Sequence, residues 1–122
     1  MKAIIFSGTR RKSLMPEVFL EATAMFSSVE IMLADIYVGD AKGVDKTVRD
    51  YWPDAKVFKA DWHRLKKAAG NIRNEAMIAA ALEEHDPKDI ILLAFPCKRS
   101  VGTYNCVKSA GKVGIKSIVT PI

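Results

Sequence analysis

Short apolar runs alternate along the chain with longer segments in which apolar residues recur at helical spacing. The run Ile90-Ile91-Leu92-Leu93 is apolar at four consecutive positions, which is typical of a strand covered on both faces of a parallel sheet. We therefore expect it to be an interior strand. The runs that predict strands are 3–6, 34–38, 55–60, 89–95 and 116–120.

Apolar positions at helical spacing predict a helix between each pair of these strands. Ser13 to about Ser28 predicts the first helix, with Ser13 as its N-cap and Pro16 in its first turn. Pro53 ends the second helix and Gly111 ends the last. The three later helices are predicted at 44–52, about 71–84 and 102–110.

Strands that alternate with helices predict an α/β fold in which helices cover both faces of a parallel sheet. We expect residues 1–122 to form one Rossmann-like domain of three layers, with a mainly parallel sheet of about five strands. The longest apolar runs are too short to cross a bilayer, and the first residues lack the apolar length of a signal peptide. We therefore expect a cytoplasmic protein with no membrane partner.

Charge and residue composition limit the kinds of partner and site that the chain can have. The net charge of +5 favours an anionic partner, either a small anionic ligand or nucleic acid. Cys97 and Cys106 are wrongly spaced for a zinc ribbon or a redox pair, and His63 and His85 are isolated in the sequence, so we expect no metal and free thiols. No serine-hydrolase, Walker or G-x-G-x-x-G motif occurs.

The turns that follow the strands carry the candidate site, because ligands bind at the carboxyl ends of the strands in an open parallel sheet. Glycine lets the backbone approach a ligand there, and the N–H groups at a helix start attract anions. The turn from Pro96 to Thr103 combines hydroxyls with Lys98 and Arg99, as in a phosphate cradle. The candidate ligand-binding residues are Ser7, Gly8, Thr9, Arg10, Gly39, Asp40, Ala41, Gly43, Asp45, Trp62, Arg73, Asn74, Pro96, Ser100, Gly102 and Thr103.

Each candidate also has an ordinary structural interpretation. Gly, Ser and Thr are common in turns and caps, and Asp45 in a first helical turn complements the helix dipole. Arg73 is either a ligand for phosphate or a solvated side chain, and Trp62 either stacks on a base or packs at a rim.

Taken together, these turns resemble the SLOG superfamily, which includes the DNA-processing protein DprA, the LOG cytokinin-activating enzymes and small stand-alone proteins related to YspA and YpsA. The likeness is greatest to the small branch and covers nearly the whole chain. The segments that carry it are Ser7-Gly8-Thr9-Arg10, Val38-Gly39-Asp40-Ala41-Lys42-Gly43-Val44-Asp45, Ala60-Asp61-Trp62, 67–77, and Ala94-Phe95-Pro96 with Ser100-Val101-Gly102-Thr103.

The resemblance implies a Rossmann-like fold that binds nucleotides or their derivatives, and it favours ligand contacts for Asp45 and Arg73. Some members of the superfamily sense NAD-derived or ADP-ribose-like signals in conflict between hosts and mobile elements, a role that comes to this chain by analogy. No cofactor is expected beyond a nucleotide-derived ligand. We also expect a homodimer or higher homo-oligomer, because relatives often self-associate.

One departure from the LOG enzymes bears on catalysis. Those enzymes carry glutamates shortly after Gly-Thr that serve cleavage of a nucleoside monophosphate at its glycosidic bond, whereas here Tyr104 and Asn105 follow Thr103. Because such cleavage needs a carboxylate near the sugar, the candidates are Asp40, Asp45 and Glu75. The leading interpretation is a binding or sensing protein. The alternatives are a LOG-like phosphoribohydrolase and a DprA-like binder of single-stranded nucleic acid.

Overall fold

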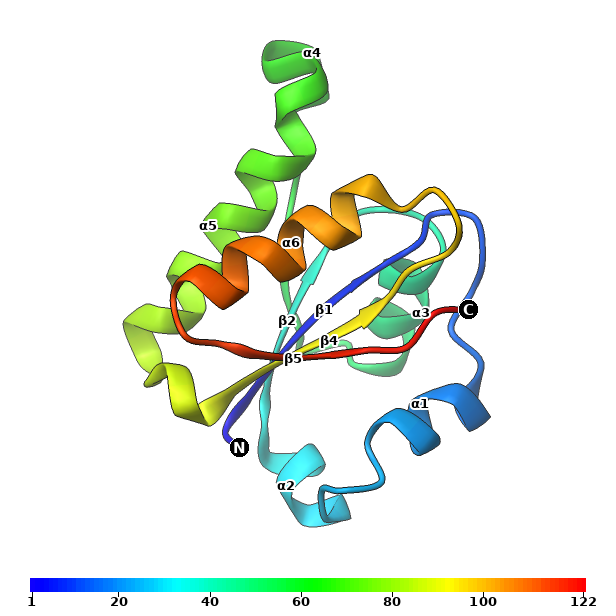
Figure 1. Cartoon of the computed structure of the whole chain (residues 1–122), viewed down its shortest axis with the longest axis vertical. Helices are drawn as coiled ribbons and strands as arrows, with labels where there is room; N and C mark the ends of the chain where they lie inside the picture. The colour runs from blue at the N-terminus through cyan, green and yellow to red at the C-terminus, as the bar shows by residue number, and fades with distance from the viewer.

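A sheet of five parallel strands forms the middle layer of the computed structural model, which describes every residue from Met1 to Ile122 (Figure 1). The strand order is β3-β2-β1-β4-β5. This is the Rossmann order, in which the chain winds outward from β1 in one direction and then, from β4, in the other. The predicted fold is confirmed. The strands are β1 (Ala3–Gly8), β2 (Asp35–Gly39), β3 (Lys56–Phe58), β4 (Ile90–Phe95) and β5 (Lys116–Val119).

Helices cover both faces of the sheet and bury two separate cores. Side chains alternate between the faces of a strand, so Ile4 and Phe6 join one core while Ala3 and Ile5 join the other. Helices α1 and α3 pack on the first face, and α5 and α6 pack on the second. The helices are α1 (Pro16–Ala22), α2 (Ser28–Leu33), α3 (Val44–Tyr51), α4 (Trp62–Leu65), α5 (Ala69–Glu84) and α6 (Val101–Lys112).

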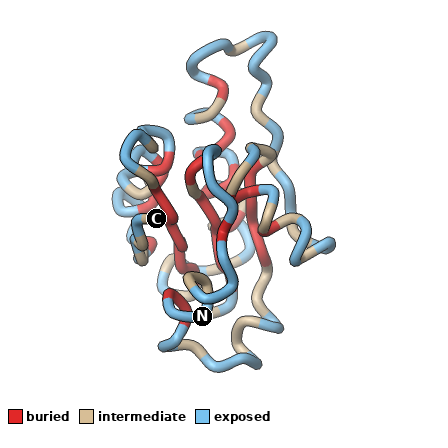
Figure 2. Tube along the Cα trace, turned by 90° about the vertical axis from the view of Figure 1, so that its right-hand side faces the viewer, coloured by how far each residue is buried: buried red, intermediate tan, exposed pale blue.

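Strand β4 is buried along its whole length, as its continuous apolar sequence predicts. Its side chains contribute to both cores, with Leu92 in one and Leu93 in the other. It pairs with β1 on one side and β5 on the other, which makes it an interior strand. Figure 2 shows the buried residues gathered at the centre of the molecule, with exposed residues on the outer turns of the helices and in the loops.

The prediction of one helix from Ser13 to about Ser28 is wrong. Helix α1 begins after Met15, without a side-chain cap, and ends at Ala22; Pro16 does lie in its first turn. A second helix, α2, follows because Ser27 and Glu30 form a capping box. The Ser27 Oγ accepts from the Glu30 N–H at 3.1 Å, and the Glu30 carboxylate accepts from the Ser27 N–H at 3.2 Å.

The basic stretch after β3 is helical rather than a loop. Asp61 caps α4 by accepting the Arg64 N–H at 3.1 Å, a 3₁₀ turn spans Lys66–Ala68, and α5 starts at Ala69, earlier than predicted. Helix α4 and the start of α5 extend beyond the edge of the sheet (Figure 1).

Helix α6 runs through Gly111, which the sequence predicted as its end. The glycine with left-handed backbone after this helix is Gly114, at φ +81°. None of the helices combines the length and the apolarity that crossing a lipid bilayer requires.

Candidate ligand-binding site at the carboxyl ends of the strands

A pocket of about 380 Å³ lies where the turns after β1 and β4 diverge, and α5 forms another of its walls. This is the topological switch point of the fold, the place where doubly wound sheets bind ligands. Its volume is within the range of small-molecule sites. The predicted residues that line it are Ser7, Gly8, Thr9, Arg10, Ala41, Asp45, Trp62, Arg73, Asn74, Ser100, Gly102 and Thr103.

Four predicted residues support the pocket without lining it. Gly39 lies under two lining side chains, since a Cβ there would lie 2.6 Å from Asp45 Oδ2 and 2.7 Å from Arg73 Nη1. Gly43 begins α3 at φ +70°, and a Cβ on it would lie 2.4 Å from the Thr9 carbonyl oxygen. Pro96 is buried, and its carbonyl accepts the Ile122 N–H at 2.8 Å. The fourth residue is Asp40.

Asp40 holds Arg73 in place. The Arg73 Nη1 donates to Asp40 Oδ1 at 2.7 Å, and the Arg73 Nε donates to Asn74 Oδ1 at 2.9 Å. Asp40 Oδ1 also accepts the Ala60 N–H at 3.2 Å, so one carboxylate joins the turn after β2, the end of β3 and helix α5. The guanidinium is therefore oriented by two side chains before any ligand arrives.

Five buried side chains of the pocket each keep one polar atom without a protein partner. These residues are at least nine-tenths buried, yet the atoms in question are not sealed from solvent. Because buried polar atoms in folded proteins are nearly always hydrogen-bonded, open ones on the floor of a pocket mark places where a ligand or water bonds. The atoms are Ser7 Oγ, Asp45 Oδ1, Arg73 Nη2, Asn74 Nδ2 and Thr103 Oγ1.

Burial of the charged Asp45 carboxylate destabilises the folded protein. Burial raises the pKa of its carboxyl to about 6, against the opposing effects of the Arg73 charge, the Ala41 N–H and the Arg49 charge. Its Oδ2 accepts that Ala41 N–H at 3.2 Å. Perturbed carboxyls in clefts are candidates for functional groups, because nothing in simple packing requires them.

The start of α6 supplies backbone donors to the same pocket. The N–H groups of Gly102 and Thr103 make no hydrogen bond within the protein, and Ser100 does not cap the helix with its side chain. A Cβ on Gly102 would have no atom within 4 Å, so the approach to this helix end is open. Free N–H groups and the helix dipole together favour an anion here.

The charges around the pocket are mostly positive. Five basic side chains line it, whereas Asp45 is the one carboxylate that does. The exposed Trp62 forms part of the rim, where the Arg10 guanidinium lies 4.6 Å from its ring centroid. This arrangement suits an anionic ligand with a flat apolar part. The five basic residues are Arg10, Arg11, Lys67, Arg73 and Arg99.

Several lining residues on α5 and on the 3₁₀ turn before it were not predicted. Lys67 of that turn and Gly70, Asn71 and Met77 of α5 line the pocket together with Arg73 and Asn74. Their spacing of three or four residues is the helical signal that could have found them once Arg73 was chosen. The other lining residues outside the predicted set are Phe6, Arg11, Cys97, Arg99, Val101 and Asn105.

The structure separates the three candidate catalytic carboxylates. Asp45 lines the pocket, Asp40 lies behind Arg73, and Glu75 is exposed on α5 and does not line the pocket. Asp45 is therefore the one of the three candidates that faces the pocket.

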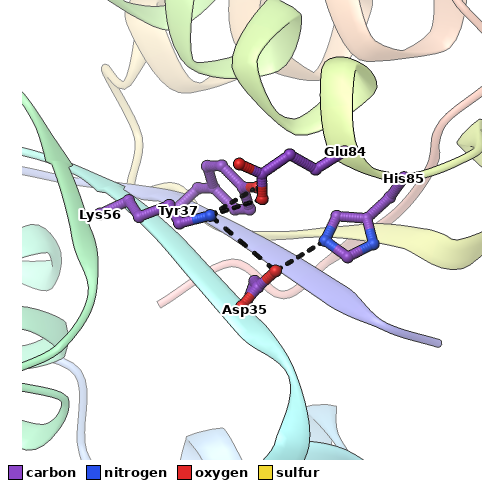
Figure 3. Close-up of polar contacts among 5 residues, drawn as sticks. All are labelled: Asp35, Tyr37, Lys56, Glu84 and His85. Atoms are coloured by element: carbon purple, nitrogen blue, oxygen red, sulfur yellow. Dashed lines mark hydrogen bonds and ion pairs between the residues drawn. The ribbon is translucent and has the colours of Figure 1, made fainter.

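A second polar cluster lies at the opposite edge of the sheet, where β2 begins (Figure 3). His85 is not isolated in space, because its Nε2 lies 2.8 Å from Asp35 Oδ2, and these atoms and a Glu84 oxygen fall within 4.8 Å of one another, as metal ligands would. The Lys56 ammonium already supplies a positive charge, at 2.6 Å from Glu84 Oε2 and 3.4 Å from the Tyr37 hydroxyl. We interpret the cluster as an ion-pair network that ties the end of α5 to β2 and β3.

The chain is similar to one curated phage protein. The Gene 61 protein of Mycobacterium phage D29 is 34% identical to it over 90 residues, which cover 66% of this chain and 66% of the phage protein. The chain thus spans about two thirds of that relative's length, and the relative's name states no activity. No protein-family model and no solved structure matches the chain.

Proposed function

We propose that the protein binds a nucleotide or nucleotide-derived ligand, of the ADP-ribose, NAD or nucleoside-phosphate class, and acts as a sensor or sequestering protein. One observation carries the proposal: the free N–H groups of Gly102 and Thr103 and the open Nη2 of Arg73 face the same pocket. Backbone donors at a helix start combined with a fixed guanidinium are a recurrent way to bind phosphate.

The rest of the pocket suits the remainder of such a ligand. Asp45 Oδ1 and Asn74 Nδ2 offer an acceptor and a donor for ribose hydroxyls, and Trp62 offers an aromatic face for a base. The resemblance of the turns to the SLOG superfamily supports the same ligand class.

Thermal shift against a ligand panel tests the proposal, because selective binding to the folded state stabilises it by about 2.7 kcal/mol at one hundred dissociation constants. The panel holds nucleoside mono- and diphosphates, ADP-ribose, NAD and cyclic nucleotides, and native mass spectrometry of fresh protein looks for a retained ligand. We expect a selective shift that Arg73→Ala abolishes. No shift with any member and no retained mass would refute the proposal.

A second candidate, a phosphoribohydrolase, is favoured by Asp45 alone. It is the carboxylate that lines the pocket, and burial raises its pKa to about 6, near the range of a general acid or base at neutral pH. Under this hypothesis Asp45→Ala abolishes release of free base from a nucleoside monophosphate while binding persists. Absence of turnover by the wild-type protein across the common nucleotides would remove it.

A third candidate, a binder of single-stranded nucleic acid, is supported by the basic rim and the exposed Trp62. It predicts affinity for oligonucleotides that falls steeply as salt rises. A flat salt response would argue against it.

We also propose that the protein acts in the cytoplasm as a homo-oligomer. Exposed apolar side chains on α1 and α2 support self-association, since burial in an interface would remove their apolar surface from water. Light scattering after size exclusion tests the oligomeric state. The side chains are Leu20, Val29, Met32 and Leu33.

A further inference from the structure

Cys97 lies inside the candidate pocket and holds two hydroxyl groups against its sulfur. It follows β4 and Pro96, and it lines the pocket. Its Sγ lies 3.0 Å from Thr9 Oγ1 and 3.5 Å from Ser100 Oγ. The sulfur thus bridges the turn after β1 and the turn after β4.

Both hydroxyl oxygens also accept a backbone N–H. Thr9 Oγ1 accepts the Arg11 N–H at 3.1 Å, and Ser100 Oγ accepts the Cys97 N–H at 2.8 Å. Because each oxygen already serves as an acceptor, each hydroxyl hydrogen is free to point at the sulfur. A thiolate sulfur can only accept hydrogen bonds, so once Cys97 ionises both hydroxyl groups donate to it and stabilise the thiolate.

The pKa of the Cys97 thiol is consistent with these two hydroxyl contacts. Hydrogen bonds from Ser100 and then Thr9, with the Arg99 backbone and the Arg11 charge, lower the pKa of the Cys97 thiol to about 7. Cys106 has the opposite environment, since it is 1% exposed and burial raises its pKa to about 11. Cys106 can therefore serve as an internal reference of low reactivity for measurements on Cys97.

We propose that Cys97 is a modification site, a reactive thiolate within the pocket that oxidants of the peroxide class convert to sulfenic acid. Cys97 lines the same pocket as the open polar atoms of Arg73, Asn74 and Thr103, so a ligand that fills this pocket would restrict access to the sulfur. Resting on the proposed function, the inference adds that ligand binding and oxidation at Cys97 exclude each other.

The reaction balances with peroxide as the oxidant. A sulfur lone pair attacks one oxygen of hydrogen peroxide, the S–O bond forms and the O–O bond breaks, and the leaving hydroxide takes a proton to become water. The sulfur is oxidised to Cys–SOH and the peroxide is reduced. Because the thiolate is the reacting form, the rate follows the fraction of Cys97 that is ionised.

Alkylation by iodoacetamide, followed by peptide mass mapping of the wild-type protein between pH 5.5 and 9.5, tests the reactivity. We expect Cys97 to react at least tenfold faster than Cys106 at pH 7, with a midpoint near pH 7. Thr9→Val and Ser100→Ala should each raise that midpoint. Equal rates at the two thiols, or a Cys97 midpoint that neither variant moves, would overturn the proposal.

Trapping with dimedone after peroxide treatment gives the oxidation readout. We expect the adduct on Cys97 and none in Cys97→Ser, which leaves Cys106 in place. A dimedone adduct confined to Cys106, or none at either thiol, would contradict the modification site.

ADP-ribose as a probe separates this inference from the proposed function. A thermal shift with ADP-ribose together with slower alkylation of Cys97 supports both. A shift with an unreactive Cys97 overturns the inference and leaves the ligand proposal standing. Fast alkylation that ADP-ribose does not slow, with no shift, keeps Cys97 as a modification site and counts against ADP-ribose as the ligand.

Discussion

The Arg73 guanidinium donates to the Asp40 carboxylate across 2.7 Å, and this contact joins helix α5 to the turn after β2. Only Nη1 and Nε of the guanidinium are used in the protein, by Asp40 and Asn74. Asp40 is therefore a positioning residue, and under the proposed function Arg73 is the residue that contacts the ligand. Mutation of each residue in turn can separate the role of Asp40 from that of Arg73.

Arg73→Ala should abolish the ligand-induced thermal shift, and Arg73→Lys should not restore it, because an ammonium cannot bond Asp40, Asn74 and a phosphate in one plane. Loss of the ion pair should also lower the free energy of unfolding by about 1.5–3 kcal/mol, the range for hydrogen bonds to charged groups. Urea unfolding and thermal shift measure the two effects.

Asp40→Asn is the matched control for Arg73. It should lower the free energy of unfolding, since Ala60 and Arg73 both bond this carboxylate, while the guanidinium and hence ligand stabilisation remain. If Asp40→Asn removed binding as completely as Arg73→Ala, the division of roles between the two residues would be wrong.

Asp45→Asn should stabilise the unliganded protein at neutral pH. Its pKa is about 6 in the folded protein against an ordinary value of 3.8, so the folded state binds this proton more tightly than the unfolded chain. That stabilisation is complete below about pH 4 and is lost as pH rises towards 6, to a total of up to about 3 kcal/mol. Asparagine is neutral, like the protonated carboxyl, so the variant does not lose this stabilisation as pH rises.

Urea unfolding at pH 4 and pH 7.5 measures this effect. We expect the variant to exceed the wild type in unfolding free energy at pH 7.5 and to match it near pH 4, and to lose affinity for a ribose-containing ligand. An identical difference at both pH values would show that burial does not raise the Asp45 pKa.

Much of the fold was predictable because the strands are apolar runs separated by helical periodicity. All five strands and the parallel order of the sheet follow from that alternation. The break between α1 and α2 was missed because apolar spacing continues past Ala22, while the capping box of Ser27 and Glu30, which is visible in the sequence, starts a new helix. Helix α4 was missed because its four residues are too short for periodicity to reveal.

The site was predictable as far as it depends on turns. All of the candidate ligand-binding residues expected from the turns after β1 and β4 line the pocket except Pro96, because parallel strands bring their carboxyl ends to one edge. Which member of a turn faces the pocket was not predictable: Asp45 faces it, whereas Asp40 turns behind Arg73. That difference depends on side-chain packing over Gly39, which no local pattern encodes.

Gly102→Ala should separate folding from ligand binding. Gly102 and Gly111 both lie in α6, and a Cβ at either would have no atom within 4 Å, so each alanine should add about 0.5–1 kcal/mol of stability. Only Gly102 lines the pocket, and a methyl group there restricts the approach of a phosphate to the helix start. We expect Gly102→Ala to weaken ligand binding and Gly111→Ala to leave it unchanged, as measured by calorimetry. Equal affinities in the two variants would show that the ligand does not bind at the start of α6.

Thr103→Val tests the last open polar atom of the pocket floor. The Thr103 hydroxyl has no protein partner, so its replacement by a methyl group should leave the unfolding free energy within about 0.5 kcal/mol of the wild type. If the hydroxyl bonds the ligand, affinity should fall about tenfold, which corresponds to about 1.4 kcal/mol. Thr23→Val is the matched control, because the buried Thr23 hydroxyl donates to the Phe19 carbonyl at 2.8 Å, away from the pocket. That variant should lose stability and keep its affinity, so that the two threonines show opposite effects on folding and on binding.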